Sequence, residues 1–235
     1  MVDCYIALTE FARQKMISGG LPADRIRVKP NFVLPDPEPK SGAGDYALFV
    51  GRLAESKGIA SLLECWKKLP HVPLHVVGDG PCREQIEAEL KQGTIPSVTY
   101  RGRLPRAETI AAMKNARFLV FPSEWYEGFP VTIAEAFACG VPVVCTRLGA
   151  MQEIVSDGTT GLHFQVGDVE DFRQKVDWAW SHPAEIETMG RRARQEFERK
   201  YTAERNAAML EEIYEFASQR RGNPLPLELP ENVTV

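Results

Sequence analysis

Several features that would assign a chain to a class of protein are scarce or absent here. The 235 residues contain no apolar run near the roughly 20 residues that a membrane-spanning helix needs. The first residues lack the basic start and apolar core of a signal peptide. The five cysteines form no CxxC pair, and the four histidines show no metal-ligand spacing. We therefore expect reduced thiols, no bound metal and a cytoplasmic location.

An excess of positive charge is also missing. The formal net charge is −4, so the chain lacks the basic balance of a nucleic-acid-binding protein, and we expect no nucleic-acid partner. Arginines and a lysine gather between residues 191 and 200, but neighbouring glutamates balance them. A solvated face is therefore favoured there over contact with a membrane surface.

What the sequence does contain is a regular alternation of short apolar runs and helical patterns. The predicted strands cover residues 4–8, 26–28, 46–50, 74–77, 98–100, 118–121, 141–145 and 162–166. The predicted helices cover residues 10–18, 59–69, 83–91, 106–115, 131–139, 150–155, 169–181, 183–201 and 203–220. Continuous apolar strands that alternate with helices indicate an α/β fold with a doubly wound, Rossmann-like parallel sheet. Ligands of such sheets bind beyond the carboxyl ends of the strands.

Residues 122–140 carry the strongest local signal. A predicted buried strand precedes them, and Pro130 suits the first position of a helix because its missing N–H would be unpaired there anyway. Gly140 is typical of the end of that helix. The helix is apolar almost all round except for Glu135, and a buried carboxylate is costly unless a protein group or a ligand pairs with it.

The start of the same helix is a candidate anion site. The N–H groups of Val131, Thr132 and Ile133 should be free of helical partners, and the helix dipole would favour negative charge beside them. Glu127 precedes the helix in a glycine-containing loop and would stand over the same place.

The two glutamates, separated by seven residues around Gly-Phe-Pro, resemble the E-x7-E signature of retaining glycosyltransferases with the GT-B fold, specifically family four. The resemblance implies that Glu135 holds the ribose hydroxyls of a nucleotide-sugar donor and that Glu127 contacts the donor hexose. It also implies that the donor is approached by the backbone of Gly128, Phe129, Pro130, Val131 and Thr132. The alternative is a buried helix whose glutamate forms a private salt bridge.

A second motif follows the predicted strand 46–50. Its loop places Arg52 and Lys57 beside a helix start, which suits a diphosphate because Arg pairs with two oxygens and Lys adds a point charge. The residue order is not that of a Walker A loop. It resembles the G-R-L-x(n)-K-G element of the same family, which implies that Gly51 lines the donor site and that Arg52 and Lys57 neutralise the leaving diphosphate. The alternative is two surface cations in a β–α loop.

Two further motifs match the family but leave alternatives open. The turn around Gly78 matches the family's donor-cleft turn, and either contacts the ligand or is an ordinary turn. Glu153 lies in a segment that packs beside the site in relatives, and is either functional or a brace for its loop.

The loop that contains Leu104 lies against the nucleotide base in relatives, so Leu104 is a predicted donor-binding residue. Guanine offers hydrogen-bond donors on its Watson–Crick edge and therefore needs an acceptor from the protein. Arg103 and Arg106 can only donate. This mismatch favours a UDP-sugar over a GDP-sugar.

The resemblance also divides the chain. Residues 1–35 are predicted to be the end of an N-terminal domain with its crossover linker, and residues 36–220 a nucleotide-sugar-binding domain with C-terminal helices. Residues 221–235, which contain three prolines, are predicted to be a flexible tail. An acceptor-binding domain precedes this part in relatives, so we expect one in the full protein.

The sequence therefore predicts the donor-binding half of a retaining hexosyltransferase with Glu127, Arg52 and Lys57 as catalytic residues, no cofactor, and an unknown acceptor. The isolated chain would then be inactive. One alternative is a non-catalytic module that binds nucleotides or nucleotide sugars. A Rossmann oxidoreductase is disfavoured because no G-x-G-x-x-G follows the first strand of the alternating region.

Overall fold

The structure is a computed structural model that describes residues 2–221, so the predicted tail lies outside the described residues except for Arg221, the last residue of a helix. The strands are β1 (Tyr5–Ala7), β2 (Ile26–Val28), β3 (Tyr46–Val50), β4 (Leu74–Val77), β5 (Val98–Gly102), β6 (Ala116–Phe121), β7 (Val143–Thr146) and β8 (Gly161–Phe164). The helices are α1 (Glu10–Ser18), α2 (Ile59–Trp66), α3 (Arg83–Gln92), α4 (Arg106–Lys114), α5 (Val131–Ala138), α6 (Gly149–Ile154), α7 (Val169–Ser181), α8 (Pro183–Lys200) and α9 (Ala203–Arg221). Two 3-10 turns, η1 (Ala23–Arg25) and η2 (Glu55–Lys57), were not predicted.

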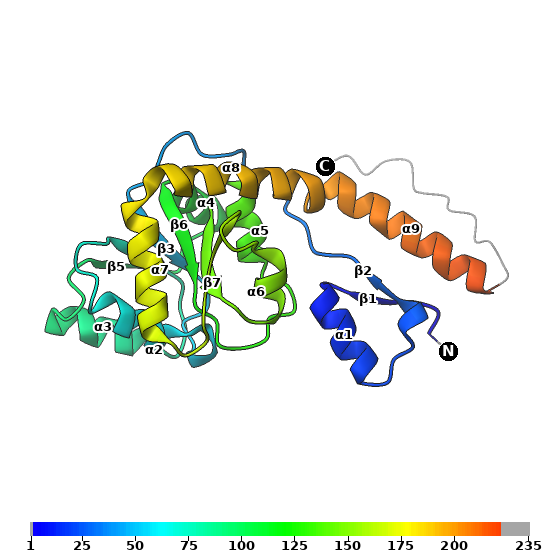
Figure 1. Ribbon diagram of the computed structural model, residues 1–235, viewed down its shortest axis with the longest axis horizontal. Helices are drawn as coiled ribbons and strands as arrows, with labels where there is room; N and C mark the ends of the chain where they lie inside the picture. Colours follow the sequence, from blue (N-terminus) through cyan, green and yellow to red (C-terminus); the bar gives the residue numbers. More distant parts are fainter. Residues whose placement is uncertain (1, 222–235) are drawn as a thin grey trace.

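Strands β3 to β8 form one sheet in the order β5-β4-β3-β6-β7-β8, and every neighbouring pair is parallel (Figure 1). The chain moves outward from β3 to β5, returns to β6 beside β3, and then moves outward to β8. This order confirms the predicted doubly wound α/β fold. The carboxyl ends of β3 and β6 lie side by side at this reversal, which is where ligands of such sheets bind.

Alternating residues of the strands fill two cores, one on each face of the sheet. Along β6, Phe118 and Val120 belong to the core beneath α2 and α7, whereas Leu119 and Phe121 belong to the core beneath α5 and α6. Helix α8 contributes to both cores. Burying each such side chain stabilises the folded state by about 1.5–3 kcal/mol. The central strands therefore form the core of the molecule.

The N-terminal unit is a separate two-stranded parallel sheet, β1-β2, with α1 packed on it. Thr9 caps α1 by accepting a hydrogen bond from the N–H of Ala12 at 3.1 Å. The carboxylate of Glu153 in α6 accepts the N–H groups of Glu10 and Phe11, each at 2.8 Å. Glu153 is therefore a brace that ties α1 to the large domain.

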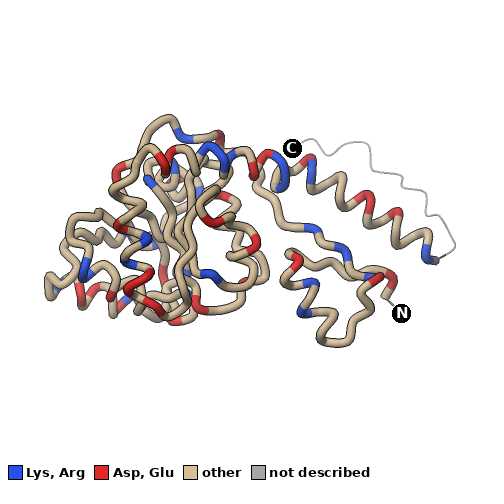
Figure 2. The backbone as a smooth tube through the Cα atoms, in the orientation of Figure 1, with Lys and Arg blue, Asp and Glu red and all other residues tan. Residues whose placement is uncertain are grey.

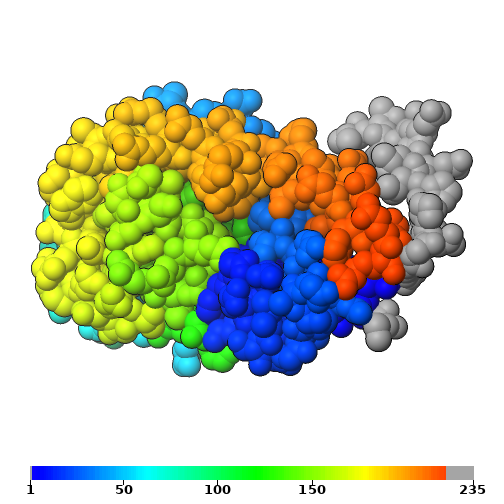
Figure 3. Space-filling view, turned by 45° about the vertical axis from the view of Figure 1, so that its right-hand side comes forward, coloured from blue at the N-terminus to red at the C-terminus, as the bar shows by residue number. Residues whose placement is uncertain are grey.

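Helix α9 holds the other side of this unit. Arg27 of β2 lies over the ring of Phe216 at 3.6 Å, and Arg220 forms an ion pair with Asp24 at 2.6 Å. Figure 3 shows the blue N-terminal unit in contact with both the green and the orange-red parts of the chain. The last helix thus returns to the first unit.

Element ends differ from the predictions by a few residues. Helix α2 ends at Trp66 rather than Leu69, because the N–H groups of Lys68 and Leu69 bond to carbonyls three residues back and tighten the chain into a turn. Strand β5 extends to Gly102, two residues beyond the predicted end, and its last pairing with β4 carries a register shift.

The segment between β2 and β3 is fastened to the domain at two points. The Nζ of Lys40 donates to the carbonyl of Ala116 at 2.6 Å, and burial lowers the pKa of Lys40 to about 8. Arg194 of α8 forms two 2.7 Å hydrogen bonds to the carboxylate of Asp36 and a third to the carbonyl of Ala138 at the end of α5. The segment thus bridges α5 and α8.

Replacing Arg194 with Ala should lower the free energy of unfolding by about 2 kcal/mol, because Asp36 and the Ala138 carbonyl would lose a charged donor. Urea denaturation measures this. Arg191→Ala is the control, since Arg191 is 62% exposed and pairs with Glu187 of the same helix, and it should cost under about 0.5 kcal/mol. Equal losses in the two variants would contradict the bridging role.

Candidate functional site

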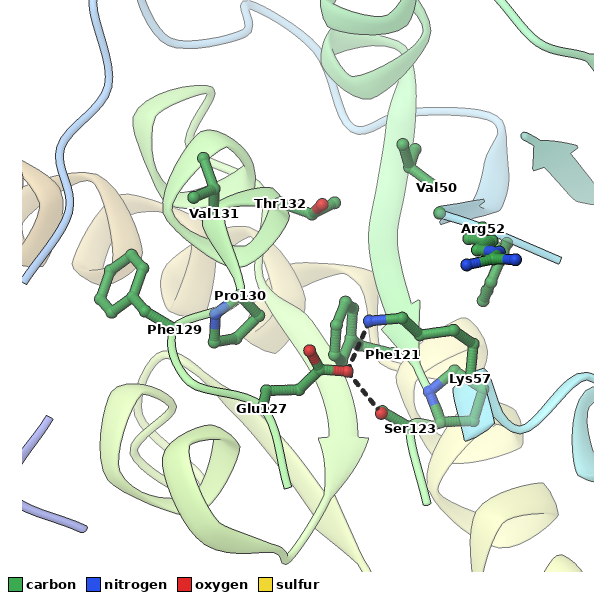
Figure 4. A pocket seen from close by; sticks show the side chains of 13 residues that line it. Val50, Arg52, Lys57, Phe121, Ser123, Glu127, Phe129, Pro130, Val131 and Thr132 are labelled. Atoms are coloured by element: carbon green, nitrogen blue, oxygen red, sulfur yellow. Dashed lines mark hydrogen bonds and ion pairs between the residues drawn. The ribbon is translucent and has the colours of Figure 1, made fainter. Parts of the chain in front are cut away.

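A cavity of about 300 Å³ lies beyond the carboxyl ends of β3 and β6, where the strand order reverses (Figure 4). We call it the switch-point cavity. It is lined by Phe49, Val50, Gly51, Arg52, Lys57, Phe121, Pro122, Ser123, Glu127, Phe129, Pro130, Val131 and Thr132. Two motifs that lie about 70 residues apart in the sequence therefore meet at one place.

The first wall is the loop after β3, and a neighbouring turn holds it in place. Gly78 lies in that turn rather than in the cavity lining: a Cβ at Gly78 would lie 1.8 Å from the carbonyl oxygen of Gly51. The N–H of Leu53 donates to the carbonyl of Asp79 in the same turn at 3.0 Å. Gly78 thus allows the close backbone contact that supports the loop presenting Arg52, while its predicted ligand contact stays a prediction.

The 3-10 turn η2 places Lys57, and Gly58 ends it with a left-handed backbone, φ +71°. A Cβ at Gly58 would lie 2.0 Å from the carbonyl oxygen of Pro122, so only glycine allows the loop after β3 to lie against the loop after β6. The carbonyl of Ser56 accepts the N–H of Glu124 at 3.0 Å and joins the two loops directly.

Glu127 and Lys57 meet across these two loops. The Nζ of Lys57 lies 2.6 Å from Oε1 of Glu127, and the hydroxyl of Ser123 donates to the same oxygen at 2.7 Å (Figure 4). The ammonium also lies 5.6 Å from the ring centre of Phe121. Within residues 2–221, Oε2 of Glu127 has no hydrogen-bond partner, so this oxygen is available to a ligand.

The N-terminus of α5 forms the third wall, with two corrections to the prediction. The helix begins at Val131, and Pro130 precedes it with an extended backbone instead of occupying the first helical position. The N–H of Ile133 is not free, because it donates to the carbonyl of Pro130 at 2.9 Å. The N–H groups of Val131 and Thr132 make no hydrogen bond within the described chain, so two of the three predicted donors remain for an anion.

Glu135 lies one turn further along α5 and outside the cavity lining. Its side chain is 16% exposed and its Oε1 lies 3.5 Å from Nη2 of Arg106, a long ion pair to a side chain that is 57% exposed. Burial raises the pKa of Glu135, and the nearby Arg106 charge lowers it. The buried carboxylate is thus only partly compensated by protein, and its predicted ribose contact stays a prediction.

Two other predicted donor-binding residues do not line the cavity. Leu104 is half-buried against the core beneath α5, and Gly128 is exposed in the loop between Glu127 and Phe129. Phe129 does line the cavity, and its ring contacts Tyr201 at 5.6 Å between ring centres. The roles of Leu104 and Gly128 also stay predictions.

Sequence reasoning missed Ser123 as a site residue. Its hydroxyl positions Glu127, and its own carbonyl accepts the hydroxyl of Thr146 at 2.7 Å. The sequence does carry a signal for this role, since Ser123 is a polar residue two positions after a buried parallel strand. Such positions lie at the ligand-binding edge of the sheet. Phe49 and Phe121 line the cavity as ordinary strand residues, and their apolar pattern gave no indication of it.

Charge is otherwise mixed over the molecule, as the interspersed blue and red segments in Figure 2 show. The predicted basic face of α8 is paired with glutamates: Arg199 and Lys200 both contact Glu196, at 2.8 and 2.6 Å. Within residues 2–221 no group of three or more His, Cys, Asp and Glu side chains is arranged to hold a metal ion. In that range no helix combines the length and apolarity that crossing a membrane requires.

The cavity therefore concentrates groups that bind negative charge. Arg52 has no hydrogen-bond or ion-pair partner within the described residues, Lys57 has donors beyond the one given to Glu127, and the α5 terminus adds two N–H groups. A ligand with two phosphates would match these donors, and one with adjacent hydroxyls would match Oε2 of Glu127.

A family profile described as "Glycosyl transferases group 1" matches residues 34–196. The chain belongs to this family. The matched region runs from the linker into α8 and contains every residue of the switch-point cavity.

Several curated relatives of this group 1 domain are glycosyltransferases. An uncharacterised glycosyltransferase of Methanocaldococcus jannaschii is 30% identical over 73% of this chain and 49% of its own length. A D-rhamnosyltransferase of Pseudomonas aeruginosa is 29% identical over 67% of this chain and 42% of its own length. A glycogen synthase of Mycobacterium tuberculosis is 28% identical over 80% and 46%. The chain thus spans about half the length of the curated relatives it matches.

Solved structures agree with the fold. Anabaena HepE in complex with UDP has a TM-score of 0.80 at 19% identity, over 92% of this chain and 64% of HepE. Sucrose-phosphate synthase from Thermosynechococcus elongatus has a TM-score of 0.81 at 24% identity, over 91% and 58%. At these identities the likeness establishes the fold, which is that of GT-B glycosyltransferases.

The Lys57–Glu127 pair should be energetically coupled. A double-mutant cycle with Lys57→Met and Glu127→Gln should give a coupling free energy of about 1 kcal/mol, because both side chains are mostly buried, at 27% and 17% exposure. Urea denaturation of the four proteins measures it. The control cycle on Arg191 and Glu187, both about 60% exposed, should give about 0.3 kcal/mol. Coupling no larger than the control would contradict a preformed pair.

Proposed function

We propose that the switch-point cavity binds a nucleoside-diphosphate sugar and that this domain supplies the donor site of a retaining glycosyltransferase. The observation that carries the proposal is the meeting, at the reversal of a Rossmann-like sheet, of Arg52, Lys57, Glu127 and the α5 N-terminus around one cavity. The group 1 family membership and the UDP named in the HepE structure support it.

The diphosphate is assigned to the cationic part of the cavity. Arg52 binds two phosphate oxygens through its planar guanidinium, and Lys57 adds a point charge. The N–H groups of Val131 and Thr132 complete the contact at the positive end of α5. These groups also stabilise the charge that develops on the diphosphate as it leaves.

The sugar and the nucleoside lie on either side of the diphosphate. Oε2 of Glu127 accepts a hydroxyl of the donor hexose while Oε1 stays with Lys57 and Ser123. Glu135 lies four residues after Val131 on the same face of α5, beside the cavity, and holds the ribose. Its weak pairing with the exposed Arg106 leaves lone pairs for the ribose hydroxyls.

The reaction breaks the bond from the anomeric carbon to the diphosphate and forms one to an acceptor hydroxyl on the same face of the sugar. The acceptor proton leaves with the diphosphate. Glu127 is the only carboxylate that lines the described cavity, so the two-carboxylate double displacement of glycosidases is not proposed. A UDP-sugar is favoured over a GDP-sugar because the loop after β5 carries Arg103 rather than an acceptor for guanine.

Calorimetric titration with UDP, GDP and NAD tests the donor site. UDP should bind the unaltered chain, and Arg52→Ala should weaken it on the order of tenfold to a hundredfold through the loss of a charged hydrogen-bonding group. Arg191→Ala, on the distant face of α8, should leave the affinity unchanged. Binding of NAD alone, or equal effects of the two variants, would overturn the assignment.

Turnover separates a transferase from a non-catalytic binding module. In the family resemblance an acceptor domain completes the site, so release of UDP from UDP-hexoses should be measured for this chain and for the longest protein that its reading frame encodes. The longer protein should transfer sugar with an unchanged anomeric configuration by proton NMR. Donor binding without turnover in either protein would favour the module, and an inverted product would exclude retention.

A further inference from the structure

A second hollow shares the loop after β6 with the switch-point cavity. It measures about 490 Å³ and lies beyond the carboxyl end of β7, lined by Phe11, Tyr126, Arg147, Gln152, Glu153 and the backbone of residues 148–149. We call it the aromatic hollow. Tyr126 and Glu127 are adjacent in the sequence, yet Tyr126 lines this hollow and Glu127 lines the switch-point cavity. The loop after β6 is therefore the wall between two cavities.

This loop exposes two large aromatic side chains to solvent. Trp125 is 68% exposed, more than any other large apolar side chain within residues 2–221, and Tyr126 is 55% exposed. Neighbouring exposed aromatic side chains are typical of binding surfaces, because burying them against a partner removes a large apolar area from water.

The ring of Tyr126 packs against the N-terminal unit. It contacts Phe11 of α1 at 5.0 Å between ring centres, and the Nζ of Lys15 lies 5.3 Å from its centre. A Cβ at Gly149 would lie 3.0 Å from the Tyr126 ring, so glycine there leaves room for it. The N-terminal unit thus contributes Phe11 to the aromatic floor of the hollow.

Planar polar groups surround this floor. The guanidinium of Arg147 contacts Asp157 through one nitrogen at 3.2 Å and keeps further donors. The side-chain amide of Gln152 has no hydrogen-bond partner within the described residues, and its side chain is exposed. The Glu153 carboxylate is already engaged by the N–H groups of α1, so donors and one amide acceptor remain for a ligand.

We propose that the aromatic hollow is the subsite for a sugar ring of the acceptor, an inference that rests on the proposed function. One face of a pyranose presents C–H groups that stack on the electron-rich face of an aromatic ring, and its hydroxyls suit the amide and guanidinium groups at the edge. The rings of Tyr126 and Phe11, together with the side chains of Gln152 and Arg147 in the same lining, provide this combination.

The position of the hollow fits the reaction. An acceptor sugar on Tyr126 would lie across a single loop from Glu127, beside which the donor hexose is proposed to lie. A hydroxyl of the acceptor sugar would then reach the anomeric carbon of the donor hexose across this loop. Trp125, on the solvent side of the same loop, would extend the stacking surface to a second sugar unit.

Saturation-transfer NMR tests the subsite with a panel of methyl hexosides and their disaccharides, added to the chain in the presence of UDP. At least one saccharide should receive saturation from aromatic protons. Tyr126→Ala and Gln152→Ala should lower the affinity for that saccharide on the order of fivefold or more. Tyr126→Phe should retain its affinity, because the ring remains.

Tyr214→Ala is the matched control, since Tyr214 is 53% exposed on α9 and should not affect the saccharide. Calorimetric UDP affinity, measured on each variant, separates the two proposals. Loss of saccharide binding in Tyr126→Ala and Gln152→Ala, with UDP affinity unchanged, supports the acceptor subsite. Binding of UDP without any saccharide in the panel, or a saccharide affinity equal in Tyr126→Ala and the unaltered chain, would overturn it. Absence of UDP binding would count against the donor site instead.

Discussion

The contact between the loop after β3 and the loop after β6 is the constraint on which the rest of the site depends. Gly58 allows it, because any side chain there would collide with the Pro122 carbonyl, and the Ser56 carbonyl fastens it. Only in this arrangement can Lys57 reach Glu127 across 70 positions of sequence. The cavity, its cations and its carboxylate all follow from two backbones lying in direct contact.

The same contact brings the opposite charges of Lys57 and Glu127 together. A lysine and a glutamate that are mostly buried form an ion pair, and the hydroxyl of Ser123 donates to the same carboxylate oxygen. Among the described residues, no anionic side chain pairs with Arg52 or with the α5 terminus. The site thus keeps a surplus of positive groups for a diphosphate while it presents one fixed acceptor oxygen for a sugar, which is the combination that the proposed donor requires.

Much of this site could be predicted from sequence because its motifs are local. Arg52, Lys57 and Glu127 each follow a strand of a parallel sheet, and the carboxyl ends of such strands lie on one edge. Pro130 and Ile133 were assigned wrongly because a helix start is decided by one residue's backbone angles, here the extended Pro130. Ser123 was missed because a hydroxyl gains a role only from the side chain that the fold places beside it.

By itself, the sequence determined the alternation of strands and helices, the parallel sheet and the motifs at its edge, because hydrophobic period and glycine or proline positions act within a few residues. Only the tertiary structure decided the contacts between distant segments. Glu153 became the brace of α1, Glu135 lay outside the cavity beside Arg106, and Tyr126 came to rest on Phe11. Such pairings depend on how whole elements pack, and no local pattern records the partner that packing brings within a few ångströms.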